Sequence, residues 1–203
     1  MSQIERIIQG SGELFLRAGI KSITMDDIAR HIGMSKKTIY QFFKDKNDLV
    51  TASLKKKLKE DEEQMADIIS KSENVIEEMI NMMKCSEEVL SQINPTVVHD
   101  LQKYHPEAWA EFQKFKIGVL ISTMEQLLTK GMKQGYIRTD IDVKIMARMR
   151  VSQFELGFNT EIFPMGEFNI GKVQMQFLEH FNYGICTLKG YKLLNQYKNI
   201  HEE

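Results

Sequence analysis

Residues 23–46, ITMDDIARHIGMSKKTIYQFFKDK, have the pattern of two short helices joined by a tight turn. Thr24 is placed to cap the first helix, and two aspartates follow it in the first turn, where the helix dipole favours acids. Gly33 supplies the backbone freedom that a tight turn requires, and Ser35 can cap a second helix beginning at Lys36. The stretch therefore predicts a helix-turn-helix, a motif that can lay its second helix in the major groove of DNA.

The second helix is predicted to have an inward apolar face and an outward polar face. Ile39, Phe42 and Phe43 recur at the spacing of one helical side. The opposite side carries donors for phosphates and base edges, namely Lys36, Lys37, Tyr40, Gln41 and Lys44. The alternative is a solvated basic helix on an ordinary helical protein. Agreement of cap, turn and both faces favours the DNA-binding interpretation.

These residues resemble the N-terminal signature of the TetR family of bacterial transcriptional repressors. The resemblance covers about the first fifty residues, and the matching positions are Gly19, Thr24, Met25, Ile28, Ala29, Gly33, Met34, Ser35, Thr38, Ile39, Tyr40 and Phe43. It implies operator contacts by the residues at 36, 37, 38 and 40 and a phosphate contact by Lys46, which opens the next helix. Many relatives carry Gly where Lys37 stands, so the operator sequence cannot be transferred from a relative.

The motif and the resemblance together give one set of candidate DNA contacts. They are Thr24, Lys36, Lys37, Thr38, Tyr40, Gln41, Lys44 and Lys46. Charge supports this end of the chain, because residues 30–59 hold nine cationic side chains and two acidic ones, whereas residues 60–88 hold ten acidic and two cationic. The formal net charge of the whole chain is only -1, which excludes a globally basic nucleic-acid binder. The lysines of residues 55–59 are interpreted as a solvated helix face.

The sequence contains no recognisable motif for a catalytic site or a metal site. The two cysteines, Cys85 and Cys186, are far apart and fit neither a metal site nor a disulfide framework, so we interpret them as buried thiols, with a redox pair as the alternative. The five histidines lack metal-ligand spacing, and no nucleophilic triad or dinucleotide fingerprint occurs. We expect no enzyme activity, no cofactor, no membrane contact and a cytoplasmic location.

The coarse secondary structure is all-α, with an N-terminal three-helix DNA-binding head and a C-terminal helical ligand-binding and dimerisation body. We expect the head to span 1–46 and the body 47–203, joined by a helix over 46–70 that Asp45 caps. The helices expected in the body are 72–93, 95–104, 106–134, 142–158, 169–189 and 190–199, with a loop at 162–166.

The expected helices 142–158 and 169–189 carry more apolar side chains than one face can hide. This pattern predicts a homodimer through a four-helix interface, which the family resemblance also implies. A fully internal helix pair is the alternative. The candidate interface residues are Met149, Phe154, Val173, Phe177, Phe181 and Ile185.

Thirteen methionines and several aromatic residues could line an adaptable pocket for an apolar or aromatic effector. The candidates are Met79, Met83, Trp109, Phe112, Phe115, Met124 and Phe158. Core packing is the competing interpretation for each of them.

The sequence thus favours a homodimeric repressor that binds a double-stranded palindromic operator and releases it when a small molecule binds. The alternatives are a helical metabolite-binding or catalytic protein whose head does not bind DNA, and a TetR-like activator.

Overall fold

The computed structural model describes residues 2–200, which divide into two compact units. Unit 1 comprises residues up to 62 together with 92–115, and unit 2 comprises 63–91 and the residues from 116 onward. This division differs from the predicted boundary at Lys46, because unit 1 includes much of the fourth helix and two later helices.

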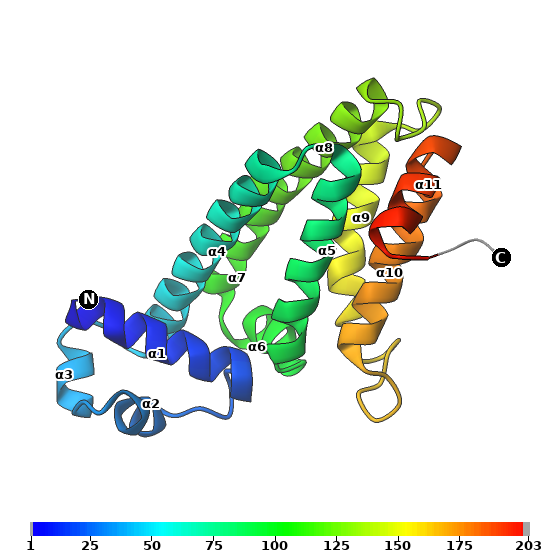
Figure 1. The fold of residues 1–203 in the computed structure, drawn as a ribbon. Helices are drawn as coiled ribbons and strands as arrows, with labels where there is room; N and C mark the ends of the chain where they lie inside the picture. The colour runs from blue at the N-terminus through cyan, green and yellow to red at the C-terminus, as the bar shows by residue number, and fades with distance from the viewer. Residues whose placement is uncertain (1, 201–203) are drawn as a thin grey trace. The chain divides into compact units, whose positions relative to one another are not determined.

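Helices make up nearly all the regular structure of both units, which confirms the all-α prediction (Figure 1). Unit 1 contains α1 (Gln3–Ala18), α2 (Met25–Ile32), α3 (Lys36–Tyr40), the first part of α4 (Lys46–Lys71), α6 (Thr96–Tyr104) and α7 (Pro106–Phe115). Unit 2 contains the end of α4, then α5 (Val75–Gln92), the π-helical segment η1 (Lys116–Leu120), α8 (Ile121–Lys133), α9 (Val143–Gly157), α10 (Ile170–Ile185) and α11 (Leu188–Tyr197).

Local capping signals set the ends of the first helices in unit 1. Thr24 forms a reciprocal capping box with Asp27 at the start of α2, and Ser35 accepts the Thr38 backbone N–H at the start of α3. Gly33 has φ of 64°, in the left-handed region that glycine adopts without steric cost. The predicted helix-turn-helix is therefore present.

Unit 1 has one apolar core that includes residues from the later helices. Ile7, Ile28, Ile39 and Leu49 are fully buried, and Ala108 of α7 belongs to the same cluster. The Asn94 backbone N–H, just before α6, donates to the carbonyl of Leu16 at 2.6 Å. The three N-terminal helices therefore fold together with α6 and α7 rather than as an isolated head.

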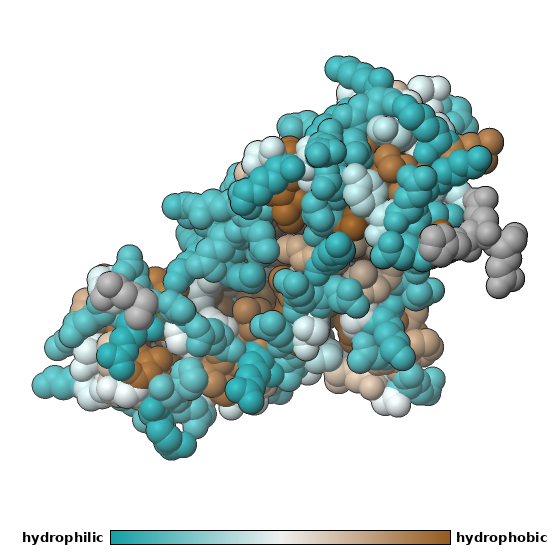
Figure 2. Space-filling model, viewed as in Figure 1, coloured by the Kyte–Doolittle hydropathy of each residue, from teal (hydrophilic) through white to brown (hydrophobic). Residues whose placement is uncertain are grey.

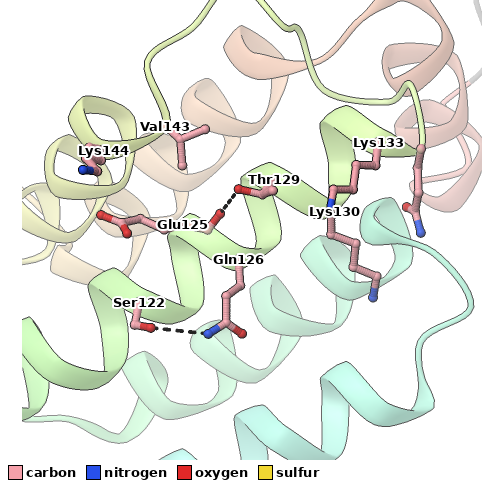
Figure 3. A pocket seen from close by; sticks show the side chains of 9 residues that line it. Ser122, Glu125, Gln126, Thr129, Lys130, Lys133, Val143 and Lys144 are labelled. Carbon is pink, nitrogen blue, oxygen red and sulfur yellow. Dashed lines mark hydrogen bonds between the residues drawn. The ribbon is translucent and has the colours of Figure 1, made fainter.

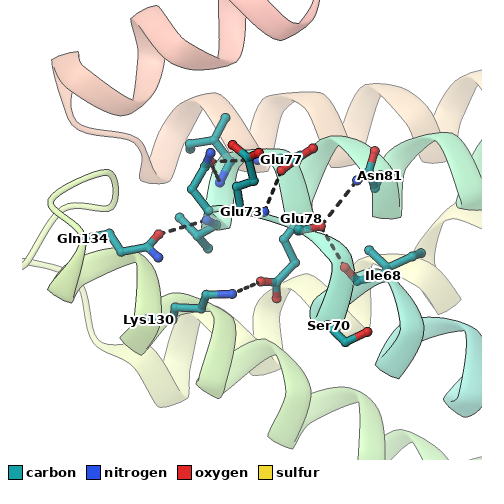
Figure 4. Close-up of polar contacts among 12 residues, drawn as sticks. Ile68, Ser70, Glu73, Glu77, Glu78, Asn81, Lys130 and Gln134 are labelled. Carbon is teal, nitrogen blue, oxygen red and sulfur yellow. Dashed lines mark hydrogen bonds and ion pairs between the residues drawn. The ribbon is translucent and has the colours of Figure 1, made fainter.

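Unit 2 is a bundle in which α9 packs against both α8 and α10. A buried carboxylate, Glu78 of α5, pairs with the Lys130 ammonium at 2.7 Å, and Gln134 accepts the Val75 backbone N–H at 2.9 Å (Figure 4). These contacts join the start of α5 to the end of α8.

Two of the predicted helices differ most from the structure. The long helix expected over 106–134 is interrupted by η1, a π-helical turn that the apolar period does not reveal. The last long helix ends at Ile185 rather than 189, because the Thr187 hydroxyl accepts the Gly190 backbone N–H and caps a new helix.

Hydrophilic side chains cover most of the face of the molecule shown in Figure 2, with small groups of apolar side chains between them. Within residues 2–200, none of the helices is long and apolar enough to cross a bilayer.

Candidate nucleic-acid interface

Helix α3 is anchored by one buried residue and presents its polar side chains outward. Ile39 is fully buried, and Phe43 just beyond the helix is 6% exposed. Three predicted contacts of α3 are exposed, Lys36, Lys37 and Tyr40, and so are Gln41 and Lys44 just beyond the helix. All five are therefore accessible to a duplex, as groove docking requires.

Phe42 was expected on the inward face, and this expectation is wrong. The residue is 38% exposed, because α3 ends at Tyr40 and the helical period no longer applies to the turn that follows. An aromatic side chain therefore borders the polar surface of α3.

Three predicted contacts already have partners within unit 1. The Lys36 ammonium lies 2.9 Å from the Asp26 carboxylate, and this hydrogen bond raises the pKa of Lys36. Both groups are solvent-exposed, so the pair contributes little and a phosphate can replace the carboxylate. The Thr38 hydroxyl lies 2.8 Å from the Ser35 hydroxyl, and the Thr24 hydroxyl donates to Asp27 at 2.6 Å.

The side chain of Lys46 is directed into unit 1 and is only partly exposed to solvent. Its ammonium donates to the backbone carbonyl of Ile20, between α1 and α2. Burial lowers the pKa of Lys46, while the Asp100 and Asp27 carboxylates oppose that shift. Lys46 therefore fixes the start of α4 to the loop before α2, a role that the sequence pattern did not predict.

Two further residues position the helix-turn-helix from a distance in sequence. The Arg6 guanidinium of α1 donates to the carbonyl of Ile32 at 2.6 Å, which holds the end of α2 beside the turn. Asp100 of α6 is 4% exposed and accepts the backbone N–H groups of Ile20 and Lys21 at 3.0 and 2.8 Å. Neither residue belongs to a local motif, so no sequence signal identified them.

His105 completes this buried polar group at the end of α6. The ring is 6% exposed, and its Nδ1 lies 2.7 Å from the Asn47 side-chain oxygen at the start of α4. Burial lowers the pKa of His105, the Lys46 ammonium lowers it further, and the Asp100 carboxylate opposes the shift. The folded state therefore favours the neutral imidazole.

This pKa shift predicts that unit 1 loses stability as the pH falls below the ordinary histidine value of about 6.5. The unfolded chain then binds a proton that folded His105 resists, at a cost of up to about 1.4 kcal/mol per pH unit. Urea unfolding followed by the fluorescence of Trp109, the single tryptophan, should show this loss between about pH 6.5 and 5. A His105→Gln variant should lose this part of the slope, whereas His99→Gln, at an exposed position, should keep it. Equal slopes in all three proteins would contradict the assignment.

The predicted ligand-pocket residues are divided between the two units. Trp109, Phe112 and Phe115 lie in unit 1, where the Trp109 and Phe112 rings stack with centroids 5.3 Å apart. In unit 2, Met79, Met83 and Phe158 are buried and Met124 is half-buried. The two methionines of α5 pack in the core of that unit.

A cavity of about 770 Å³ opens elsewhere in unit 2, along α8 and the first turn of α9 (Figure 3). None of the predicted residues lines this cavity. Its lining residues are mostly of polar or charged types, namely Ser122, Glu125, Gln126, Thr129, Lys130, Lys133, Gln134, Val143 and Lys144. Over residues 2–200, no three side chains of the usual metal-binding types lie close enough together to hold an ion.

The predicted dimer residues also occupy different environments. Val173, Phe181 and Ile185 are buried within unit 2, so they are core residues of a single chain rather than a free surface. Phe154 and Phe177 are half-buried, and Met149 is 42% exposed. The exposed positions of α10 are polar or glycine, namely Lys172, Gln176, His180 and Gly184. The exposed apolar face therefore belongs to α9.

Comparison with known proteins agrees with the geometry of the head. Residues 7–52 match the family model of bacterial regulatory proteins, tetR family. This match covers the helix-turn-helix and the start of α4. Over 170 residues it is 27% identical to the uncharacterized HTH-type transcriptional regulator YvaF of Bacillus subtilis, which covers 83% of this chain and 88% of the relative. The matched segment and this relative show that the chain is a DNA-binding transcriptional regulator with a TetR-type helix-turn-helix.

Solved structures share the fold along most of the chain. A TetR-family regulator from Agrobacterium tumefaciens superposes with a TM-score of 0.72 at 16% identity, covering 91% of this chain and 97% of that one. FadR from Bacillus subtilis, solved in complex with stearoyl-CoA, gives a TM-score of 0.63 at 19% identity and covers 89% and 98%. At these identities the likeness concerns the fold.

Proposed function

We propose that this regulator is a homodimeric repressor that binds a palindromic operator and releases it when a small apolar or aromatic effector binds. The observation that carries the proposal is the outward surface of α3, where Lys37, Tyr40 and Lys44 are exposed while Ile39 holds the helix in the core. Two such helices related by two-fold symmetry would meet successive major grooves about 34 Å apart.

Selection from a random duplex library tests the operator directly. The expected product is an inverted repeat whose half-sites are centred about one helical turn apart, or a multiple of it. Retention of duplexes without a shared sequence would favour the alternative, a metabolite-binding or catalytic helical protein whose head does not read DNA. A reporter gene behind the selected site separates repression from activation.

Exposed apolar residues on α9 support a homodimer. Ile145, Met149 and Leu156 are 64%, 42% and 41% exposed, and their spacing places them on one side of the helix. Exposed apolar residues on one side of a helix commonly mark an interaction surface, and two-fold symmetry would bring two copies of this stripe together.

A chain carrying Ile145→Lys and Met149→Lys should dimerise at least about a hundredfold more weakly, because two unpaired ammonium groups per protomer would be buried or would repel across the axis. Analytical ultracentrifugation measures the change. Thr129→Lys, at an exposed position on α8, adds positive charge elsewhere and should leave the dimer intact. A wild-type monomer, or an unchanged dimer in the double variant, would contradict the proposed interface.

Effector release requires a structural route from unit 2 to the head. Helix α4 is continuous from Lys46, which holds the loop before α2, to Lys71 in unit 2. A ligand can shift this helix only if it binds the DNA-free state more tightly than the DNA-bound state. The stearoyl-CoA complex of FadR supports small-molecule control of this fold. Titration of acyl compounds into the operator complex tests the proposed release.

A further inference from the structure

Helix α9 contains a cation whose charge is not compensated by the protein. Arg150 is half-buried, and among residues 2–200 its guanidinium has no hydrogen bond or ion pair. The neighbouring Arg148 differs in both respects, because its side chain is 57% exposed and it pairs with Glu125 at 2.9 Å. A guanidinium removed from water without a counter-charge is costly, so an unpaired one in an interior position calls for a partner.

An unsatisfied amide lies one turn further along the same helix. The side-chain oxygen of Gln153 is buried and accepts no hydrogen bond from the part of the chain described here. Gln153 follows Arg150 by three residues, a spacing that puts both side chains on one side of α9. Buried polar atoms in native proteins nearly always have partners, so the unmet Gln153 oxygen, one turn from an unpaired guanidinium, indicates a missing partner.

Arg150 and Gln153 lie at different places around α9 relative to its exposed apolar stripe. Gln153 follows Met149 by four residues and precedes Leu156 by three, so it borders the stripe. Arg150 follows the fully buried Ala147 by three residues, so it lies further round the helix, toward the interior of unit 2.

Apolar and amide groups surround the same part of α9. Phe154 follows Arg150 by one turn, and its ring lies 5.0 Å from that of the buried Phe158. Gln174 of α10 is 1% exposed and donates to the Phe154 carbonyl at 2.7 Å, which fixes the two helices together here. A molecule bound beside Arg150 would thus contact the guanidinium with one end and the aromatic surface of Phe154 with the part next to that end.

We propose that Arg150 and Gln153 hold the anionic head group of an apolar effector. The proposal rests on the effector response inferred above and names its chemistry: a carboxylate or phosphate attached to an apolar body. The guanidinium donates two hydrogen bonds to two oxygens of the anion. Gln153 accepts from a hydroxyl or amide of the ligand, or donates to the anion after its carboxamide rotates.

Burial also lowers the pKa of Arg150 to about 10, with no carboxylate opposing the shift. The group remains positively charged at neutral pH. An anion bound here would therefore be held by a full charge in a site partly screened from water.

Isothermal titration of the full chain, without DNA, with a matched ten-carbon series tests the assignment. Wild type should bind decanoate or decyl phosphate about ten- to a hundredfold more tightly than 1-decanol, as expected for charge-assisted hydrogen bonds. The tighter of the two anions identifies whether the head group is a carboxylate or a phosphate. Arg150→Met should bind all three compounds with similar weak affinity, and Arg148→Met should behave as wild type.

The melting temperature without ligand gives a second test, which applies even if Arg150→Met changes the fold of the binding site. Since Arg150→Met removes an uncompensated charge, its melting temperature without ligand should exceed that of wild type, while Arg148→Met should not gain stability. Three outcomes would overturn the proposal. Wild type could bind the anions and 1-decanol equally well, it could show no saturable binding of either anion, or Arg150→Met could keep the preference for anions. Because DNA is absent, the result is independent of whether the chain selects an operator.

Discussion

A chain carrying Lys37→Ala and Lys44→Ala is expected to bind its operator at least about a hundredfold more weakly than wild type at 0.15 M salt. Both side chains are exposed on or just beyond α3, and neither ammonium has a hydrogen-bond or ion-pair partner within the described residues. A dimer would lose four cations facing the duplex. Fluorescence anisotropy with a labelled operator measures the loss, and the salt dependence should flatten as phosphate contacts disappear.

The matched control removes the same charge from unit 2. Lys133→Ala with Lys192→Ala alters two exposed lysines outside the helix-turn-helix and should leave operator affinity within about twofold of wild type. Equal losses in the two double variants would mean that net charge alone controls binding, and α3 would no longer be the DNA-contacting element.

Replacing Asp100 with Ala is expected to cost unit 1 about 3 kcal/mol of stability. One carboxylate oxygen accepts both the Ile20 and the Lys21 backbone N–H groups, and the residue is 4% exposed. Truncation leaves two buried or partly buried donors unsatisfied, and it removes a negative charge that favours the protonated form of the partly buried Lys46. Urea unfolding followed by Trp109 fluorescence measures the change in unit 1, where Trp109 packs against the core.

Two further variants refine this prediction. Asp100→Asn keeps an oxygen that can accept both N–H groups, so it should cost less than Asp100→Ala. Asp67→Ala removes an exposed carboxylate that pairs with Lys71 across one turn of α4, and should change stability by less than about 0.5 kcal/mol. An Asp100→Ala protein as stable as wild type would show that α6 does not hold the loop before α2.

The sequence predicts the helix-turn-helix well because its signals are local. Thr24, Gly33 and Ser35 act on residues no more than a few positions away, and the structure places each in its expected cap or turn. The helical period of α3 also predicts that Lys37 and Tyr40 are exposed when Ile39 is buried, as the structure shows. Phe42 departs from the pattern only because the helix is shorter than its apolar period indicates.

Contacts between distant parts of the chain could not be predicted from the same signals. Asp100 lies 80 residues from its partner Ile20, and His105 lies 58 residues from Asn47. Apolar character alone likewise could not separate core from interface, so Phe181 and Ile185 looked available although unit 2 buries them. Arg150 gave no signal because a lone arginine in a helix has no motif, and only its surroundings show that it lacks a partner.

DNA recognition through α3 is tested most directly by comparing two affinities of the full chain. One is its affinity for the selected operator, and the other is its affinity for a scrambled duplex of equal length and composition at the same salt concentration. The account predicts that the operator binds at least about a thousandfold more tightly. Equal affinity for the two duplexes would contradict it, because the surface of α3 would then attract phosphates without reading the bases.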